Sequence, residues 1–292
     1  MMGEHVISGE LIYKFDEVDR SDLQNKCHLD LIFQRNLDGV VVRNVLNPEQ
    51  VQSLVDGFHS ISNDQKVHRK EVSLYPRGFP AYLDNTEGSV EQDLELYFLT
   101  SESYAKNFTE KFGFDFHHVL GEALNQTSAL LKYGFQEGFG GKGIFTPSQM
   151  RCFLSNYPAL PVHCGKVFKK MYQDFYTMLS YEVEVANQVS YFIMLQEPEH
   201  GGELELYDVP WHQDQQMHPF ESIRMQDNSI LNVVHDKSVR KMTIKPSPGD
   251  MVIFMGANIW HSVQGFTGSL DRITIGGFLG PSKNGNKLVS WS

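Results

Sequence analysis

The sequence predicts a mainly β protein with a helical buttress, whose core is a double-stranded β-helix of the jelly-roll, cupin-like type. From Gln149 onward, short segments rich in β-branched and aromatic residues alternate with Gly and Pro turns, as in sandwiches and barrels. The first half instead places apolar residues at helical spacing. We therefore expect one domain over 1–292, with a largely helical part at 1–145 and a jelly-roll core at 146–292 that carries the functional site.

The clearest helix signal in the first half follows the end of a predicted strand. Asn47 suits an N-cap, Pro48 suits the first helical position, and Glu49 places an acid in the first turn. Apolar residues then recur at helical spacing over Val51–Phe58. The other predictions in this half are a strand at Gly39–Val45, a loop at 62–93, and helices at Ser103–Phe112 and Asp115–Tyr133.

The second half predicts short strands joined by turn residues. His200-Gly201-Gly202 and Ser247-Pro248-Gly249-Asp250 supply two of the turns, and Val167–Leu179 is an aromatic-rich helical insert. The predicted strands are Met150–Leu154, Gln188–Gln196, Glu203–Tyr207, Lys241–Ile244, Met251–Phe254 and Arg272–Phe278.

Composition excludes several classes of function. The formal net charge of −11 argues against a nucleic-acid polymer as partner, because phosphate binding requires a basic surface. No apolar run approaches the ~20 residues that span a bilayer, and the first residues lack a secretory signal. Cys27, Cys152 and Cys164 are widely spaced and suit reduced thiols. We expect a cytoplasmic protein without a membrane partner, and the sequence leaves its oligomeric state open.

A histidine and an arginine near the C-terminus predict a site for a metal and a carboxylate. Asp250–Phe278 predicts three short strands, with His261 at the end of the middle one and Arg272 with Thr274 on the next. Jelly rolls of this type hold iron(II) between two histidines and often a carboxylate. A guanidinium pairs bidentately with a carboxylate such as that of 2-oxoglutarate. The alternative for His261 is a core histidine that is hydrogen-bonded to the backbone and binds no metal. The alternative for Arg272 is a surface ion pair with Asp271.

The second metal-binding histidine has two candidates. His212-Gln213-Asp214 has the His-x-Asp spacing of a complete ligand set, whereas His163-Cys164-Gly165 has glycine in place of the acid. In this fold the His-x-Asp turn is expected before the long central strand, and only His163 precedes that strand. His212 lies in a polar stretch that predicts an exposed loop.

The sequence resembles the freestanding iron/2-oxoglutarate-dependent aliphatic halogenases, the group that chlorinates hapalindole- and welwitindolinone-type alkaloids. The resemblance runs from about Gly39 to the C-terminus and is strongest after Thr146. VHCG is the specific part, because in that family the glycine replaces the carboxylate ligand and chloride takes its coordination site. The other matching stretches are TPSQMRCFLSN, QVSYFIMLQEPEHGGELELYD, PSPGDMVIF and RITIGGFLGPSKNGNKLVSWS.

The resemblance implies a set of site residues and cofactors. Iron(II), 2-oxoglutarate, O2 and chloride are the implied cofactors, and the implied substrate is a small molecule presented by no carrier protein. Carboxylate and chloride each contribute one negative charge to iron, so the exchange keeps the ligand charge similar. By this resemblance, His163 and His261 would bind iron, Gly165 would border the chloride, and Arg272 with Thr274 would bind 2-oxoglutarate. Arg151 would lie near the cofactor and halide, and Ser190 would help to orient the reactive group. Leu160 and Phe168 would contact the substrate.

Three alternatives remain at this stage. The protein is a hydroxylase if the ligand set is His212 with Asp214, or if water takes the open site. It is a cupin-like binding protein if the two histidines bind no iron. The substrate is nucleotide-like rather than alkaloid-like if a basic group near the poorly matching segments 66–92 and 211–239 binds phosphate; the candidates are Lys66, Arg69, Lys70 and Arg77.

Overall fold

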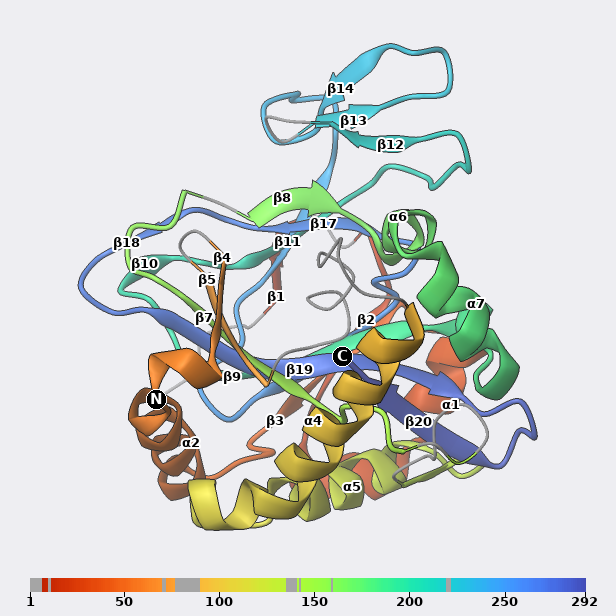
Figure 1. Ribbon diagram of the computed structural model, residues 1–292. Coiled ribbons are helices and arrows are strands. Elements are labelled where there is room, and N and C mark those ends of the chain that lie inside the picture. Colours follow the sequence, from red (N-terminus) through yellow and green to blue (C-terminus); the bar gives the residue numbers. More distant parts are fainter. Residues whose placement is uncertain are drawn as a thin grey trace.

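Two β-sheets lie face to face and form the body of the molecule (Figure 1). The computed structural model describes residues 7–9, 12–69, 72–76, 90–134, 141, 143–158, 160–218 and 222–292. The smaller sheet has the order β1 (Ile7–Gly9), β15 (Lys241–Ile244), β11 (Leu204–Tyr207), β17 (Trp260–Val263), β8 (Leu160–His163). The larger has the order β2 (Phe15–Asp19), β3 (Gly39–Arg43), β16 (Met251–Phe254), β9 (Val189–Gln196), β19 (Arg272–Pro281), β7 (Gln149–Phe153), β5 (Val72–Tyr75), β4 (Val67–Arg69). This arrangement confirms the predicted jelly roll.

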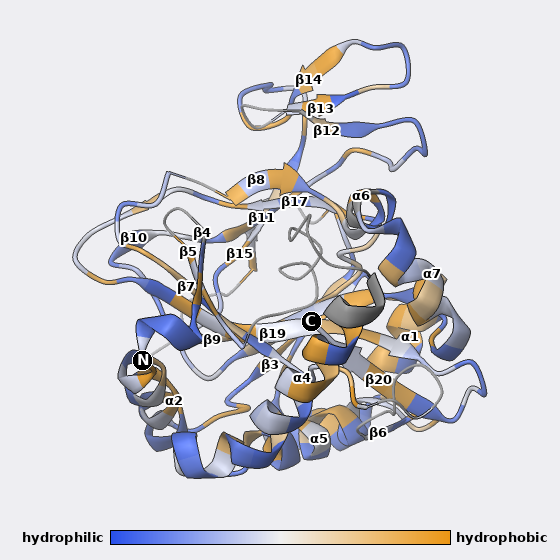
Figure 2. Cartoon of the chain, in the orientation of Figure 1, coloured by the Kyte–Doolittle hydropathy of each residue, from blue (hydrophilic) through white to orange (hydrophobic). Residues whose placement is uncertain are grey.

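Helices cover the outer face of the larger sheet and close its apolar side (Figures 1 and 2). Residues at alternate positions of the central strands, such as Ile193, Ile253 and Ile275, are fully buried in one core with Phe58 and Leu120 of the helices. Strand alternation leaves the intervening residues facing the smaller sheet. The helices on this side are α1 (His28–Phe33), α2 (Pro48–Ser60), α4 (Val90–Phe112) and α5 (Phe116–Thr127), with short 3-10 turns at Arg20–Asn25 and Asn63–Gln65.

The predicted start of α2 is confirmed in its capping detail. The Asn47 side chain accepts from the backbone N–H of Gln50, and the Gln50 side chain accepts from the Asn47 N–H, while Pro48 stands at the first helical position. This reciprocal capping satisfies two backbone donors at the helix start. One face of the helix, with Leu54 and Phe58, then enters the core.

The loop predicted at 62–93 is partly wrong. β4 and β5 lie within it and α4 begins at Val90, while residues 77–89 lie outside the described part of the chain. β5 pairs in register with β7, with Val72 opposite Phe153 and Tyr75 opposite Met150. β5 has β-branched and aromatic residues with alternating burial, and its strand form is completed by the pairing with β7.

The remaining elements connect or cover the two sheets. α6 (Gly165–Met171) and α7 (Gln173–Glu182) lead from β8 through a 3-10 turn at Val185–Asn187 to β9. β20 (Lys287–Trp291) pairs with β19 and with β6 (Lys132–Tyr133), and β10 (His200–Gly201) pairs with β18 (Phe266–Thr267). β12 (Gln216–His218), β13 (Ser222–Arg224) and β14 (Ile230–Asn232) form a separate three-stranded sheet that stands beyond the smaller sheet (Figure 1). Within the described residues, no helix has both the length and the apolar character needed to cross a membrane.

The strands that carry His261 and Arg272 belong to opposite sheets. β17 lies between β11 and β8 in the smaller sheet, and β19 lies between β9 and β7 in the larger. The expectation of neighbouring strands, with His261 at a strand end, is therefore wrong: His261 is the second residue of β17, and the chain crosses to the other sheet before β19 begins. A site between the sheets can therefore take His261 from the smaller sheet and Arg272 from the larger one.

Candidate active site

Two histidines from distant parts of the chain lie side by side on the inner face of the smaller sheet. His163 on β8 and His261 on β17 are Cα partners in the antiparallel pairing of these strands. Their ring centroids are 4.2 Å apart. Phe254, from β16 of the larger sheet, packs edge-on against the His261 ring at 4.9 Å. Both imidazoles therefore face the opposite sheet.

Backbone carbonyls fix the orientation of both rings. Nδ1 of His163 lies 2.7 Å from the carbonyl oxygen of Pro161, and Nδ1 of His261 lies 2.8 Å from that of Ile259. Because a carbonyl oxygen only accepts, each Nδ1 carries the proton and each Nε2 keeps the lone pair that binds a metal. Burial lowers the pKa of His163 to about 4 and lowers the pKa of His261 well below its usual range. Both rings are thus neutral at neutral pH, the form that ligates metals.

No third metal-binding side chain joins the pair. In the part of the chain that the structure describes, no group of three or more His, Cys, Asp or Glu side chains is placed to hold a metal ion. Gly165 stands two residues after His163, where a His-x-Asp motif has its carboxylate. Two neutral imidazoles without a carboxylate fit iron(II) that takes its remaining ligands from small molecules.

Gly165 packs directly on the turn that joins β16 to β17. Its N–H donates to the carbonyl of Gly256 at 2.8 Å. A β-carbon on Gly165 would stand 2.9 Å from the Cα of Ala257 and 3.1 Å from Nε2 of Gln188. The position at which a carboxylate side chain would begin is therefore bounded by Ala257 and Gln188, and only glycine allows this approach without displacing the turn.

The side chains predicted to bind the co-substrate gather on the inner face of the larger sheet. Arg151 on β7 and Thr274 on β19 are Cα partners, and Arg272 precedes Thr274 by two residues, so all three share a face. The Arg272 guanidinium lies between two aromatic rings, 5.9 Å from the centroid of Phe153 and 5.7 Å from that of Phe192. These rings hold the guanidinium in a fixed plane, which suits bidentate recognition of a carboxylate.

Arg272 and Arg151 are cations without an ion pair to any other described residue. Arg272 is 3% exposed, and its Nε donates to the Gly202 carbonyl at 2.9 Å. The alternative of an ion pair with Asp271 is wrong, since that carboxylate accepts from the backbone N–H of Ser155 at 2.7 Å. Burial, together with the Arg151 charge, lowers the pKa of Arg272 to about 10, so it stays charged at neutral pH. The Glu203 carboxylate opposes part of this lowering without forming an ion pair, and the buried Arg272 and half-buried Arg151 together favour a dianionic ligand such as 2-oxoglutarate.

Arg151 links the two halves of the candidate site. Its charge lowers the pKa of His163 on the smaller sheet and the pKa of Arg272 on the larger one, in both cases as a smaller effect than burial. Its own pKa is lowered by burial. The guanidinium is therefore close enough to act on ligands of a metal at His163 and on a co-substrate at Arg272.

Ser190 lies on the same inner face, next to the turn that contacts Gly165. It is a Cα partner of Phe254 and of Phe278. A β-carbon on Gly256 would stand 2.2 Å from the Ser190 hydroxyl, so this hydroxyl points at the turn. Sequence reasoning missed Phe254 and Gln188. The alternation Ser190–Phe192 places Phe192 on the site face and could have identified that residue; no pattern marks Gln188.

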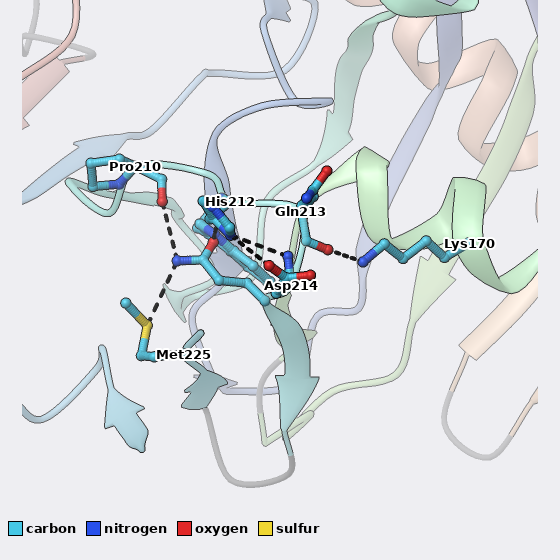
Figure 3. A network of polar contacts seen from close by, with 8 residues as sticks. Lys170, Pro210, His212, Gln213, Asp214 and Met225 are labelled. Carbon is cyan, nitrogen blue, oxygen red and sulfur yellow. Dashed lines mark hydrogen bonds and ion pairs between the residues drawn. The ribbon is translucent and has the colours of Figure 1, made fainter. Parts of the chain in front are cut away.

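The alternative His-x-Asp motif lies in the segment before β12, in a network of polar contacts with Lys170 of α6 (Figure 3). His212 is half-buried, and its Nδ1 lies 3.3 Å from the carboxylate of Asp214, while the Lys170 ammonium donates to the carbonyl of Gln213. Nearby, buried Gln215 accepts from Trp260 Nε1 at 3.1 Å and from the His212 N–H at 2.9 Å. These contacts anchor the segment before β12 to the body. Gln213 and Asp214 are exposed, as predicted for this loop, whereas His212 itself is half-buried.

The described residues among the predicted phosphate and substrate contacts do not lie where they would clearly line the site. The Lys66 ammonium stacks on the ring of Phe58 in α2, at 4.6 Å from its centroid, on the helical side of the larger sheet. Leu160 is half-buried opposite Val263 in the β8–β17 pairing. Lys70 and Arg77 lie outside the described residues, as do the side chains of Arg69 and Phe168.

Comparisons with known proteins agree with this geometry. The family model of the carrier-protein-independent halogenase WelO5 matches residues 12–292. No curated protein sequence matches the chain. Among solved structures, an N-substituted L-amino acid dioxygenase from Burkholderia ambifaria AMMD is similar at 15% identity, with a TM-score of 0.61 and 90% of each chain covered. The same dioxygenase in complex with alpha-KG gives 14% identity, a TM-score of 0.56, and coverage of 91% of this chain and 90% of that one. At such identities these two structures support the fold alone.

Proposed function

Because the chain belongs to the family of carrier-protein-independent halogenases, we propose that it chlorinates an unactivated aliphatic C–H bond of a small molecule. As a member of that family it is a non-heme iron, 2-oxoglutarate-dependent enzyme that acts without a carrier protein. The observation that carries the chlorination proposal is Gly165. It removes the carboxylate beside His163, and the described residues offer no substitute ligand.

The two histidines would bind iron(II), and Arg272 would bind 2-oxoglutarate. Nε2 of His163 and Nε2 of His261 hold iron(II), because their other ring nitrogens are committed to backbone carbonyls. Arg272, held between aromatic rings, binds the distal carboxylate of 2-oxoglutarate, and Thr274 adds a hydroxyl on the same face. When bound, iron with 2-oxoglutarate and O2 supplies hydrogen abstraction, and chloride supplies the halogen.

Arg151 and Ser190 act on the geometry of these ligands. Arg151 places a positive charge near His163 and so favours an anion beside it. Ser190 directs its hydroxyl at the Gly256 turn that packs on Gly165, which puts it beside the position that the glycine opens. Hydrogen bonds of this kind tune which ligand is transferred to the substrate.

The inner face favours an apolar substrate over a nucleotide. The rings of Phe153, Phe192 and Phe254 face the two histidines and Arg272 from the larger sheet. Lys66, the one predicted phosphate contact whose side chain is described, stacks on a helix instead. We propose an aliphatic carbon on an apolar, alkaloid-like molecule as the target, since aromatic side chains exclude water from a bound apolar ligand.

Chloride dependence tests this proposal. The iron-loaded enzyme is given 2-oxoglutarate and O2 with an indole-terpenoid alkaloid, in sodium chloride and in sodium gluconate. We expect a chlorinated product in chloride and its loss in gluconate. A hydroxylated product whose yield is the same in both salts identifies a hydroxylase. No iron-dependent turnover of 2-oxoglutarate with any substrate identifies a binding protein. Either result overturns the proposal.

A further inference from the structure

The side chain of Gln188 is buried against the candidate metal site and lacks a partner. Gln188 is 0% exposed and immediately precedes β9. Neither Nε2 nor Oε1 of its carboxamide makes a hydrogen bond with any described residue. Its Nε2 lies 3.1 Å from the position that a β-carbon on Gly165 would occupy. The unpartnered donor therefore lies beside the place where a carboxylate side chain at position 165 would begin.

The nearby hydroxyl of Tyr176 does not account for this donor. Burial raises the pKa of Tyr176 to about 12, while Gln188 and Trp291 lie near enough to its hydroxyl to oppose that rise. No hydrogen bond of ordinary geometry joins the hydroxyl to either, and the indole N–H of Trp291 is also without a partner. A buried amide that is left unpaired destabilises the fold, so its presence beside Gly165 points to a partner outside the described residues, such as a bound ligand.

The chemistry of that partner follows from the donor and its place. A carboxamide nitrogen carries two N–H groups and accepts nothing. With an aspartate at position 165, such a donor would face a carboxylate that completes the iron ligand set. With glycine there, the donor faces whatever anion replaces the carboxylate.

We propose that Gln188 is a positioning residue that donates an N–H to the halide bound beside Gly165. This inference rests on the proposed function, since it assigns a partner to the anion which that function requires. The donor holds the halide on the Gly165 side of the iron ligands, away from Arg272 and the co-substrate. It also accounts for a buried amide that the fold itself leaves unsatisfied.

Chloride binding without turnover tests the role of Gln188. Chloride is titrated into the anaerobic iron(II)–2-oxoglutarate enzyme, and the change in visible absorption gives its affinity. We expect Gln188→Leu to weaken chloride binding at least tenfold, to leave 2-oxoglutarate affinity unchanged, and to leave the melting temperature of the metal-free protein equal or higher. Chloride affinity within twofold of wild type, or a lowered melting temperature, overturns the proposal.

Two controls separate this role from a structural one. Gln196→Leu changes the same residue type at the other end of β9, where the amide donates to the Asp271 carbonyl at 2.8 Å, and we expect wild-type chloride affinity. Tyr176→Phe removes the nearby hydroxyl and should also leave chloride affinity unchanged. If Tyr176→Phe or Gln196→Leu weakens chloride binding as much as Gln188→Leu does, the proposal is overturned.

Bromide diffraction gives a readout that requires no variant. Crystals of the iron-loaded protein in sodium bromide should show an anomalous peak within hydrogen-bond distance of Nε2 of Gln188. A bromide on iron but away from Gln188 overturns the role of Gln188 and leaves the halogenase proposal intact. If the wild-type protein shows neither a chloride response nor a bromide peak, both proposals fail.

Discussion

The Cα of Ala257 lies 2.9 Å from the place where a β-carbon on Gly165 would stand. Backbone atoms, which cannot rotate aside, make this contact. The turn that carries Ala257 leads directly into β17 and His261. Any side chain at position 165 therefore acts on the metal site twice: it occupies the position beside His163, and it displaces the turn that positions the second histidine.

Gly165→Ala tests this steric relationship. We expect it to destabilise the protein by about 1–3 kcal/mol, the usual cost of overpacking, which outweighs the gain in helix propensity of up to about 1 kcal/mol. Gly134→Ala is the matched control, because a β-carbon on Gly134 would meet no atom within 4 Å. Chemical denaturation measures both. Equal stabilities for wild type and Gly165→Ala would show that the turn moves freely. For the same reason Gly165→Asp should lose chlorination without becoming an efficient hydroxylase.

The two histidines should be needed together for iron binding. His163→Ala and His261→Ala each leave one imidazole, so we expect iron(II) affinity to fall by at least tenfold in either variant, with loss of 2-oxoglutarate turnover. His212→Ala is the control, because His212 is half-buried beside Asp214 in the segment before β12; this variant should keep wild-type iron content. Iron binding measured by calorimetry under anaerobic conditions decides the matter. If only His212→Ala lost iron, the metal ligands would be His212 and Asp214 and not His163 and His261.

Arg272 should matter for 2-oxoglutarate and not for folding. Arg272→Met removes a buried, unpaired charge and keeps the aliphatic stem, so the ligand-free protein should melt at an equal or higher temperature. The rise in melting temperature that 2-oxoglutarate gives the wild type should disappear. Arg240→Met, which removes an exposed ion pair with Asp208, is the control and should keep this rise. A wild-type response to 2-oxoglutarate in Arg272→Met would contradict the assignment.

His117 should make the protein sensitive to acid. It lies in the core against the rings of Tyr104 and Phe108, and burial lowers its pKa to about 4. The unfolded chain binds a proton near pH 6.5, so this stabilisation is complete above pH 6.5 and is lost as the pH falls toward 4, by about 3 kcal/mol in total. We expect His117→Gln to flatten the fall in unfolding free energy over this interval. The exposed neighbour variant, His118→Gln, should keep the wild-type slope, and two equal slopes would refute the effect.

Sequence patterns correctly predicted those elements that are determined by neighbouring residues, such as helix caps and turns. The capping signals before Pro48 gave the start of α2, and β15 and β16 have the predicted bounds, Lys241–Ile244 and Met251–Phe254. Turn glycines at 201, 202 and 249 have the positive φ that such turns require. The preference for His163 over His212 rested on strand order, and the structure places His163 beside His261.

Features that depend on tertiary pairing could not be predicted from local patterns. β4 and β5 are only 3 and 4 residues long, so no local pattern distinguishes them from a loop; β5 is held by pairing with β7, and β4 by pairing with β5. β17 and β19 are separated in sequence only by the two-residue strand β18, yet they belong to opposite sheets, since the crossover between them is set by the whole fold. No sequence motif predicts the unpartnered amide of Gln188 or the close approach of Ala257 to Gly165, because both arise between segments that are far apart in sequence.

The pairing of β8 with β17 also governs when the protein can acquire iron during its synthesis. His163 leaves the ribosome long before His261, and the strand that carries His261 has no place until β11 and β15 are also available. The N-terminal strand β3 likewise waits for β16. Such distant pairings form late in folding. A nascent chain therefore offers single histidines and no two-histidine site, so metallation follows translation, and a ribosome-stalled chain that ends before His261 should emerge without iron.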